Sequence, residues 1–326
     1  METFLIGIDV GGTNIKIMVM ERGGLVLGKC SIPTKREEGY EPALGRMKEA
    51  IDGIFAEAGQ RAPQVDAIAM GLPGTVDAEN KKTVYLSVLH WDGFNPCREL
   101  GKYYGAPTAI ENDANLNALG EYAFGGHGVE NLVLLTLGTG VGCGIIVGGR
   151  IFGGARNTAG ELGHMIITAD GGEICLCGRK GHLEAYCSGS ALERDARRLL
   201  DSGRTTLLRE YIRERGGRYD NAQIFRGVKE KDAACMELAE RFIHYLSVGV
   251  ANVMTVLNPE LVLLGGGISN AGDLLVRPVE EKCRGMVLDE RSFCPVKKAG
   301  LGSEAGMYGA CALAARLAAE RKGEVG

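Results

Sequence analysis

One pattern of strands and glycine-rich loops occurs twice in this chain and limits what it can fold into. Each copy reads as an apolar strand, a glycine-rich loop, a second strand, a Gly-Gly turn and a third strand. The first copy has strands over 4–8, 15–20 and 25–30, a loop over 9–14 and a turn at 23–24. The second has strands over 132–137, 143–147 and 150–152, a loop over 138–142 and a turn at 148–149. The recurrence indicates a weak internal duplication of an antiparallel meander, so that two hairpins could face each other across one cleft.

Both loops have the composition of phosphate-binding loops. Only a glycine-rich loop lets backbone N–H groups close around a phosphate, because a Cβ would block the approach. In the first loop, the backbone of Gly11 and Gly12 and the side chain of Thr13 would hold phosphate oxygens. Lys16 would assist, and Asp9 would orient a hydrated Mg²⁺. Taken alone, this loop is explained equally well as a hairpin turn whose glycines serve geometry.

Two further glycine segments favour the phosphate interpretation. The loop of the second copy contains Gly138, Thr139 and Gly140, and the run Gly265-Gly266-Gly267 follows a strand predicted over 260–264.

Helices are predicted over 41–58, 112–124, 235–258 and 305–321, with another strand over 65–70 and mixed-charge helical segments between 194 and 232. The apolar face of the 235–258 helix is predicted to contain Met236, Ala239, Ile243, Leu246, Val250, Val253 and Leu257.

A carboxylate stands at the start of a predicted helix, in the run Glu111-Asn112-Asp113. Asp113 there could act as the general base that accepts a proton from an attacking hydroxyl. N-capping of the helix by Asn112 or Asp113 explains either residue equally well. Both interpretations can hold together, because a helix N-terminus is a rigid place for a catalytic carboxylate.

Four nitrogen and sulfur side chains cluster between residues 164 and 182: His164, Cys175, Cys177 and His182. This set on short glycine-bearing loops suits a structural Zn²⁺ in a closed tetrahedral site. The alternative is two buried thiols and two surface histidines. Glu161 and His164 can also bind hydroxyl groups. We expect structural roles for His90, His127 and His244, and a place for Trp91 in the core in preference to stacking on a sugar.

Composition excludes several classes of protein. The 326 residues include 37 Lys plus Arg and 41 Asp plus Glu, for a net charge of −4, which argues against a basic nucleic-acid-binding face. The N-terminus lacks the features of a signal peptide, and no apolar run is long enough to span a bilayer. We therefore expect a cytoplasmic, reduced protein whose cysteines, such as Cys143, Cys235 and Cys311, are mostly buried thiols.

Together these motifs resemble those of the ROK sugar kinases, within the actin-like ATPase superfamily, in order along essentially the whole chain. Residues 9–13 resemble the first phosphate motif of the family, 137–142 the second, and 264–269 the adenosine motif. Residues 111–114 match the catalytic stretch, and 160–164 with the cysteine loop match the family signature. Two positions differ from the family pattern: His182 replaces the usual third cysteine, and Val88-Leu89-His90-Trp91 replaces a common Asn-Leu before a tryptophan.

The resemblance implies an α/β protein of the actin-like ATPase (ribonuclease H-like) fold, with two domains and a cleft between them. The smaller domain would comprise residues 1–115 plus about 303–326, and the larger 116–302. Asp113 would be the base, with Gly71 lining the sugar pocket. The residues that would bind sugar hydroxyls are Asn112, Asp113, Glu161, His164 and Glu184. His164 would place one ring nitrogen on zinc and the other on the sugar.

The function implied is ATP-dependent phosphorylation of a hexose, with glucose at O6 as the first choice. Allose, mannose, fructose and N-acetylmannosamine are alternative substrates. Implied cofactors are ATP, Mg²⁺ and a structural Zn²⁺, and the implied assembly is a homodimer, with no nucleic-acid or membrane partner. A non-catalytic sugar-sensing protein is the main rival, although the helix-turn-helix of the family's repressors has no room ahead of Asp9. A metal-dependent hydrolase would need an open zinc position, which four protein ligands do not leave.

Overall fold

The computed structural model describes residues 3–60, 63–77, 82–85, 89, 91 and 94–323. The strands are β1 (Thr3–Val10), β2 (Asn14–Glu21), β3 (Val26–Pro33), β4 (Gln64–Leu72), β5 (Thr75–Asp77), β6 (Lys82–Tyr85), β7 (Thr108–Asn112), β8 (Leu132–Leu137), β9 (Val141–Val147), β10 (Arg150–Ile151), β11 (Leu261–Gly265) and β12 (Val296–Lys298). The helices are α1 (Tyr40–Glu57), α2 (Pro96–Tyr104), α3 (Asp113–Phe124), α4 (Glu184–Cys187), α5 (Gly189–Asp201), α6 (Leu208–Glu214), α7 (Ala222–Lys229), α8 (Ala233–Leu257), α9 (Asp273–Arg284) and α10 (Ala305–Lys322).

The chain divides into two compact units. The first comprises residues 1–130, 144–159 and 300–326, and the second comprises 131–143 and 160–299. The chain therefore leaves the first unit and returns to it twice, the last time through α10. The domain boundaries expected from the family resemblance remain a prediction.

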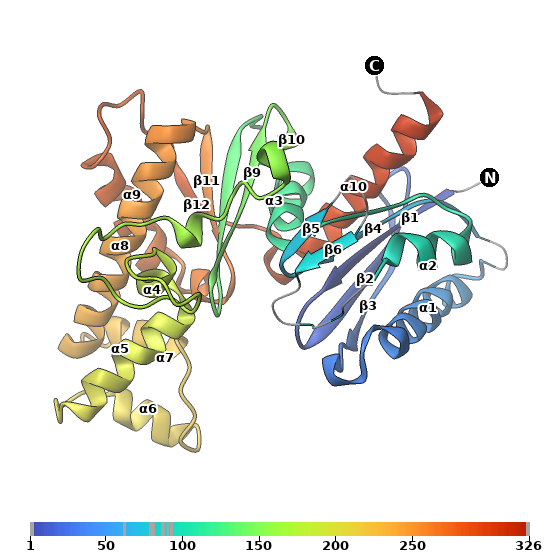
Figure 1. The fold of residues 1–326 in the computed structure, drawn as a ribbon. Helices are drawn as coiled ribbons and strands as arrows, with labels where there is room; N and C mark the ends of the chain where they lie inside the picture. The colour runs from blue at the N-terminus through green and yellow to red at the C-terminus, as the bar shows by residue number, and fades with distance from the viewer. Residues whose placement is uncertain are drawn as a thin grey trace. The chain divides into compact units, whose positions relative to one another are not determined.

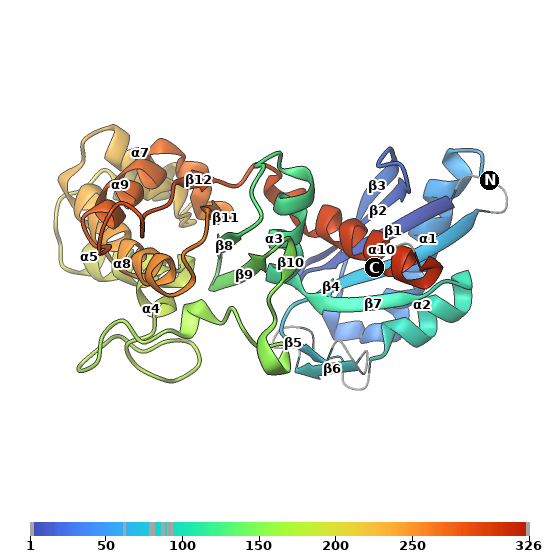
Figure 2. The ribbon, with the colours of Figure 1, turned by 90° about the horizontal axis from the view of Figure 1, so that it is seen from above.

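The first sheet has the strand order β3-β2-β1-β4-β7, with β1 to β4 labelled in Figure 1 and β7 in Figure 2. β1, β2 and β3 form the predicted antiparallel meander, while β4 pairs with both β1 and β7 in parallel. Because these three strands are parallel, their carboxyl ends meet at one edge of the sheet. The register places Asp9 opposite Gly71, and Gly71 opposite Glu111, at that edge.

Side chains alternate in direction along each strand, and both faces of this sheet are buried. Side chains such as Ile6, Ile8 and Ile17 join a large core with the apolar face of α1. Met18 and Met20 point the other way and pack with Met307 and Cys311 of α10. Figure 2 shows α10 running along the sheet. Gly7 permits this approach, because a Cβ there would lie 2.5 Å from the Met307 carbonyl oxygen.

The second sheet repeats the strand order of the first, as β10-β9-β8-β11-β12. β9 and β10 are antiparallel, and β11 is parallel to both β8 and β12. In each sheet the first strand of a meander is followed by two parallel strands that come later in the chain. The internal duplication inferred from the glycine pattern is confirmed by this shared topology.

α8 is the longest described helix and packs against α7 and α9 in the second unit. Asp232 caps its N-terminus, and Asn258 ends it in a left-handed conformation, just before Pro259. The predicted buried face is correct for Ala239, Ile243, Leu246, Val250 and Val253. The prediction is wrong for Met236, which is 48% exposed, because the first turn of the helix buries Ala234 and Cys235 instead. Leu257, in the last turn, is half-buried.

The other expected elements also have counterparts in the structure. α1, α3 and α10 lie within one residue of the helices predicted over 41–58, 112–124 and 305–321. Trp91 is buried in the first core, where it packs edge-on against Phe94, as expected. His127 contacts the buried Glu121 carboxylate, and His244 lies against Tyr245. Val88 and His90, which belong to the divergent loop, lie outside the described residues.

Candidate functional site

The carboxyl edge of the first sheet places Asp9, Gly71 and Asp113 next to one another. A Cβ built on Gly71 would lie 3.7 Å from the Asp113 Cα and 3.7 Å from Asp9 Oδ1. Gly71 therefore lies between two carboxylate residues that are about a hundred positions apart in the chain, with no side chain of its own to separate them. Carboxylates gathered at the ends of parallel strands are well placed to bind a ligand at this edge of the sheet.

Asn112 and Asp113 form the junction between β7 and α3. Asn112 Oδ1 accepts hydrogen bonds from the N–H groups of Ala114 (2.9 Å) and Asn115 (3.2 Å), so Asn112 is the N-cap of the helix. Its Nδ2 donates to the Gly74 carbonyl oxygen at 3.0 Å. Asp113 Oδ1 also accepts from the Ala114 N–H, at 2.9 Å. The capping interpretation is thus confirmed for Asn112, and capping fixes the position of Asp113.

Glu111, for which the sequence suggests no separate role, fixes this junction further. Its buried Oε1 accepts hydrogen bonds from the Asn112 N–H (2.8 Å), Asn115 Nδ2 (3.0 Å) and Asn157 Nδ2 (3.1 Å). Asn157 adopts a left-handed conformation (φ 53°) in the loop before Gly160. Glu111 therefore joins the start of α3 to that loop. No local pattern reveals the partnership with Asn157, because it lies 46 residues away.

Asp9 lies in a low-dielectric position at the end of β1. Burial raises the pKa of its carboxyl above the usual 3.8, and the charge of Lys16 offsets only part of that rise. Lys16 stands opposite Asp9 in the strand register, and its Nζ donates to the Ser303 carbonyl oxygen. A Cβ on Gly306, at the start of α10, would lie 2.6 Å from the Asp9 Cγ. Gly306 thus gives Asp9 its space, which the sequence alone does not indicate.

The first glycine loop is fixed through its carbonyl groups. The Gly11 N–H donates to the Asn14 carbonyl at 2.9 Å, and Thr34 Oγ1 donates to the Gly11 carbonyl at 2.7 Å. The Thr34 N–H donates to the Thr13 carbonyl at 2.8 Å. Gly12 lies at the turn itself, and the Thr13 side chain is exposed. This open, well-ordered turn suits a loop that approaches a ligand closely.

The second glycine loop is fixed in a similar way, within the second unit. The Gly138 N–H donates to the Gly140 carbonyl at 3.0 Å, while the Gly138 carbonyl accepts from the Gly189 N–H at 2.7 Å. Ser190 Oγ donates to the Thr139 carbonyl at 2.9 Å. A Cβ on Gly140 would collide with Glu184 Oε2. The loop therefore needs glycine where it passes α4 and the N-terminus of α5.

The third glycine run borders a cavity in the second unit. Gly266 has φ +79°, and a Cβ there would lie 2.5 Å from the Leu137 carbonyl oxygen. Gly265 ends β11, and Gly267 begins a short 3-10 helix. Gly267 and Ile268 line a cavity of about 220 Å³, opposite the α7 residues Phe225, Arg226 and Lys229. The sequence gives no sign of the α7 contribution, because α7 lies some 40 residues before the glycine run.

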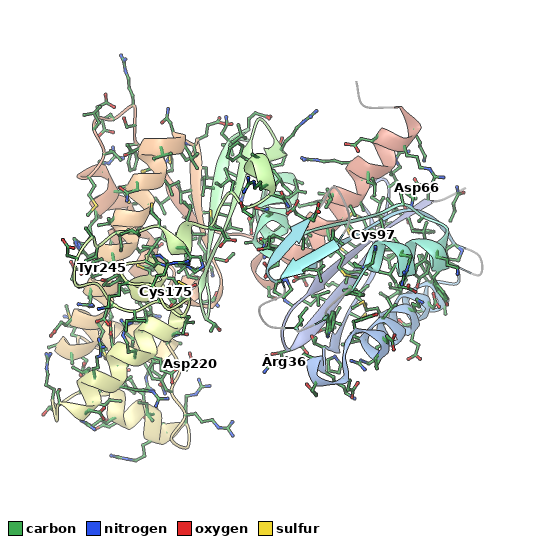
Figure 3. All side chains as sticks on the ribbon, in the orientation of Figure 1. Arg36, Asp66, Cys97, Cys175, Asp220 and Tyr245 are labelled. Carbon is green, nitrogen blue, oxygen red and sulfur yellow. The ribbon has the colours of Figure 1, made fainter. Side chains whose placement is uncertain are left out.

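The structure brings the four predicted metal-ligating side chains together. One ligand atom each from His164, Cys175, Cys177 and His182 lies within 4.8 Å of the others. His164 Nδ1 is 3.7 Å from Cys175 Sγ, and His182 Nδ1 is 3.3 Å from Cys177 Sγ. Cys175, labelled in Figure 3, and His182 are buried, whereas His164 and Cys177 are exposed. Two imidazole nitrogens and two sulfurs are the donor set of a tetrahedral zinc site, so the residues fit this metal.

Two carboxylates lie next to this cluster. His164 presents Nδ1 to the cluster, while its Nε2 is 4.0 Å from Glu161 Oε2. Glu184, at the start of α4, accepts from the Val141 N–H through Oε2 (3.0 Å) and from the Cys175 thiol through Oε1 (3.2 Å). Burial is the largest cause that raises the pKa of the Cys175 thiol, to about 12. Glu184 therefore connects the second glycine loop to the cysteine loop.

Two sheets of one topology, each beginning with a glycine-loop meander, define an actin-like ATPase fold. The chain belongs to the ROK family, whose model matches residues 5–317. It is 30% identical over 311 residues to a glucokinase of Halalkalibacterium halodurans, covering 94% of each chain. It is 31% identical to a xylose repressor of Caldicellulosiruptor bescii, covering 89% of this chain and 71% of that one. The structure of a ROK hexokinase from Thermus thermophilus matches 97% of this chain and 99% of that one, with 31% identity and a TM-score of 0.80.

A second solved structure bears on the ligands of this family. It is a ROK glucokinase from Streptomyces griseus in complex with glucose and AMPPNP, 29% identical, with a TM-score of 0.77 over 96% of this chain and 99% of that one. Among the residues that the structure describes here, no helix is both long enough and apolar enough to cross a bilayer.

Proposed function

We propose that this protein transfers the γ-phosphoryl group of ATP to a hexose, and that glucose is phosphorylated at O6. The observation that carries the proposal is the placement of Asp113 at the capped N-terminus of α3, beside Gly71 and Asp9. The similarity to glucokinases over nearly the whole chain supports the same reaction. Allose, mannose, fructose and N-acetylmannosamine are the alternative acceptors.

Asp113 acts on the acceptor hydroxyl in this proposal. Its carboxylate aligns O6 with the γ-phosphorus and accepts the O6 proton as the new O–P bond forms. The transition state of phosphoryl transfer is loose, so that orientation and charge stabilisation matter more than the strength of the base. The capped, rigid position of Asp113 meets the requirement for orientation.

The glycine loops bind the phosphates. Phosphate oxygens are assigned to backbone groups of the two glycine loops: Gly11, Gly12 and Thr13, and Gly138, Thr139 and Gly140. Lys16 adds positive charge, and Asp9 orients the hydrated Mg²⁺. When bound, Mg²⁺ neutralises charge that develops on the phosphate oxygens. The cavity beside the run Gly265–Gly267 is assigned to the adenosine of ATP, with Phe225 as an apolar wall.

Five polar side chains are assigned to the sugar hydroxyls, with Gly71 beside the sugar ring: Asn112, Asp113, Glu161, His164 and Glu184. Zn²⁺ would be held by His164, Cys175, Cys177 and His182. Bound zinc would fix the His164 ring through Nδ1, so that Nε2 is presented beside Glu161. The metal would be structural, because all its ligands come from the protein, and it would also orient a residue that binds the sugar.

A sugar-sensing protein without turnover is the second candidate, favoured by the xylose repressor among the relatives. A panel of hexoses with coupled detection of ADP distinguishes the two. The kinase proposal expects ADP release that depends on the sugar and is greatest for glucose. Sugar binding without ADP release would support the sensor. A homodimer in the cytoplasm, where the ten free thiols would stay reduced, is part of the kinase proposal.

A further inference from the structure

Glu173 stands two residues before the first cysteine of the metal cluster and points away from the cluster, toward arginines. Arg198 of α5 meets its carboxylate with both terminal nitrogens, at 2.6 Å and 3.2 Å. Arg194 of α5 and Arg241 of α8 lie at 3.9 Å and 3.7 Å from the same carboxylate.

One more carboxylate completes this network. Asp195 lies 2.8 Å from Arg194, 3.5 Å from Arg198 and 3.3 Å from Arg241. Three guanidinium groups thus share two carboxylates. The Glu173 side chain is 23% exposed and that of Asp195 is 13% exposed, so these two carboxylates are screened less by solvent than those of an exposed ion pair, although the Arg198 side chain is 59% exposed.

The backbone of Glu173 is also fixed on both sides. Its N–H donates to the hydroxyl of Tyr186 at 2.9 Å, and its carbonyl accepts from the Gly181 N–H at 3.0 Å. Tyr186 belongs to α4, which begins at Glu184, and its ring packs on that of Tyr245 at 4.2 Å between centroids. Gly181 directly precedes the ligand His182. Glu173 therefore lies next to both ends of the cysteine loop; Figure 3 labels Cys175 on this loop and Tyr245 on α8.

Apolar burial does not hold the tip of this loop. Ile174 is 63% exposed and Leu176 is 73% exposed, although both flank the ligand Cys175. Contacts of this kind contribute little, because the apolar surface remains in water. Apart from the metal ligands, hydrogen bonds and the arginine network therefore fix the position of the loop relative to α4 and α5.

We propose that Glu173 is a positioning residue: it couples the cysteine loop to α4 and α5, and so holds the metal-ligating side chains and Glu184 in their joint geometry. The proposal rests on the zinc site and the sugar-binding role of Glu184 proposed above. Glu173 touches neither metal nor sugar. Its loss should let the loop move, and so weaken retention of zinc and binding of sugar while ATP binding is unaffected.

The test compares Glu173→Gln with Glu193→Gln in the zinc-loaded full chain. Glu193 is a matched control on α5, since it pairs with Arg197 at 2.5 Å on the exposed surface. Glutamine keeps the size of the side chain but removes its charge. Four quantities are measured: the rate of zinc transfer to a chromogenic chelator, the KM for glucose, the KM for ATP, and the Tm.

We expect Glu173→Gln to speed zinc release by about tenfold or more, as loss of a residue that orients metal ligands does, and to raise the glucose KM but not the ATP KM. Glu193→Gln should leave all four quantities unchanged. Arg198→Lys should fall between wild type and Glu173→Gln, because lysine keeps the charge but not the two-point contact. Should Glu173→Gln lower only the Tm, or match Glu193→Gln in zinc release, the positioning role is wrong. Absence of zinc from the wild-type protein would instead overturn the metal site itself.

Discussion

At the scale of the residue, Asp113 is the side chain on which the proposed chemistry depends most. Asp113→Ala should lower kcat by about 10²-fold or more, because it removes the group that aligns the hydroxyl and accepts its proton. The fold should survive, since Asn112 still caps α3. Steady-state release of ADP, with circular dichroism as the check on folding, measures this. Activity within a few-fold of wild type would exclude Asp113 as the base.

The position of the Asp9 carboxylate should depend on the absence of a side chain at Gly306. In Gly306→Ala the new Cβ would lie 2.6 Å from the Asp9 Cγ, so the carboxylate must shift. We expect a several-fold higher requirement for Mg²⁺ with little loss of Tm, because alanine favours a helix by about 1 kcal/mol over glycine.

Gly53→Ala in α1 is the matched control for Gly306→Ala, since a Cβ there meets no atom within 4 Å. It should leave the Mg²⁺ dependence unchanged. Titrations of activity with Mg²⁺ compare the two variants. Equal Mg²⁺ dependence of both would show that Gly306 has no influence on Asp9.

A site can be recognised from the sequence when all the residues that form it lie within one short segment. The two cysteines and two histidines fall within 19 residues and lie together in the structure, as predicted. Glu111 with Asn157, and Glu173 with Arg198 and Arg241, cannot be recognised this way. Their partners come from other elements, and a single charged residue on a surface-like segment looks the same whether it is solvated or paired.

At the scale of the element, Asp232 holds the start of α8. Its carboxylate accepts from the N–H groups of Cys235 (2.8 Å) and Leu207 (2.8 Å) and from Thr206 Oγ1 (3.0 Å). Asp232→Ala should cost about 1–2 kcal/mol, the range for loss of an N-cap. Thermal unfolding at neutral pH measures this loss, and a Tm equal to that of wild type would contradict the capping role.

The stabilisation that the Asp232 carboxylate provides should fall as the pH falls. Burial favours the neutral form of Asp232, but the hydrogen bonds outweigh burial, and its pKa lies below 3.8. A lowered pKa means that the stabilisation is complete above the unfolded pKa of 3.8 and is lost as pH falls through the folded pKa. The difference in Tm between wild type and Asp232→Ala should therefore shrink below about pH 4. A difference that stays constant into acid would indicate that the charge contributes nothing.

The cysteine loop is the element whose order should depend on metal. Elemental analysis should find about one zinc per chain, as one cluster of four ligands implies. A strong chelator should weaken glucose binding before it unfolds the protein, because the two cores lie elsewhere. His182→Cys should retain zinc, and Cys177→Ser should lose most of it. Full glucose affinity in metal-free protein would leave the cysteines as ordinary thiols.

Periodicity predicts long elements better than short ones. The helices at 41–58, 112–124, 235–258 and 305–321 are correct to within two residues. Those at 41–58 and 235–258 repeat an apolar pattern over several turns, and the one at 112–124 begins with a recognisable N-cap. The sequence analysis does not predict α9. This helix carries Pro278 in its interior, and a proline inside a sequence pattern usually indicates the end of a helix. α2 is also unpredicted; it is nine residues long and begins with Pro96 after the N-cap Asn95.

At the scale of the whole molecule, duplication explains the recurrence of the glycine loops. Each sheet places its loop between the first two strands of a meander, and the two sheets share one strand order. The first unit also depends on close packing of α3 and α10. A Cβ on Gly309 would collide with the Leu116 carbonyl oxygen, and one on Gly120 would lie 2.9 Å from the Gly309 N. The sequence predicts both helices but not this contact, because a glycine within a helix gives no sign of what packs on it.

The identity of the reaction product tests the central proposal most directly. Wild-type protein is incubated with glucose, ATP and Mg²⁺, and the products are resolved by ³¹P and ¹³C NMR spectroscopy, with Asp113→Ala in parallel. The proposal predicts glucose 6-phosphate and ADP in equal amounts from wild type, and a rate at least about 10²-fold lower from the variant. ADP without any sugar phosphate, phosphate on another hydroxyl, or equal rates from both proteins would contradict it.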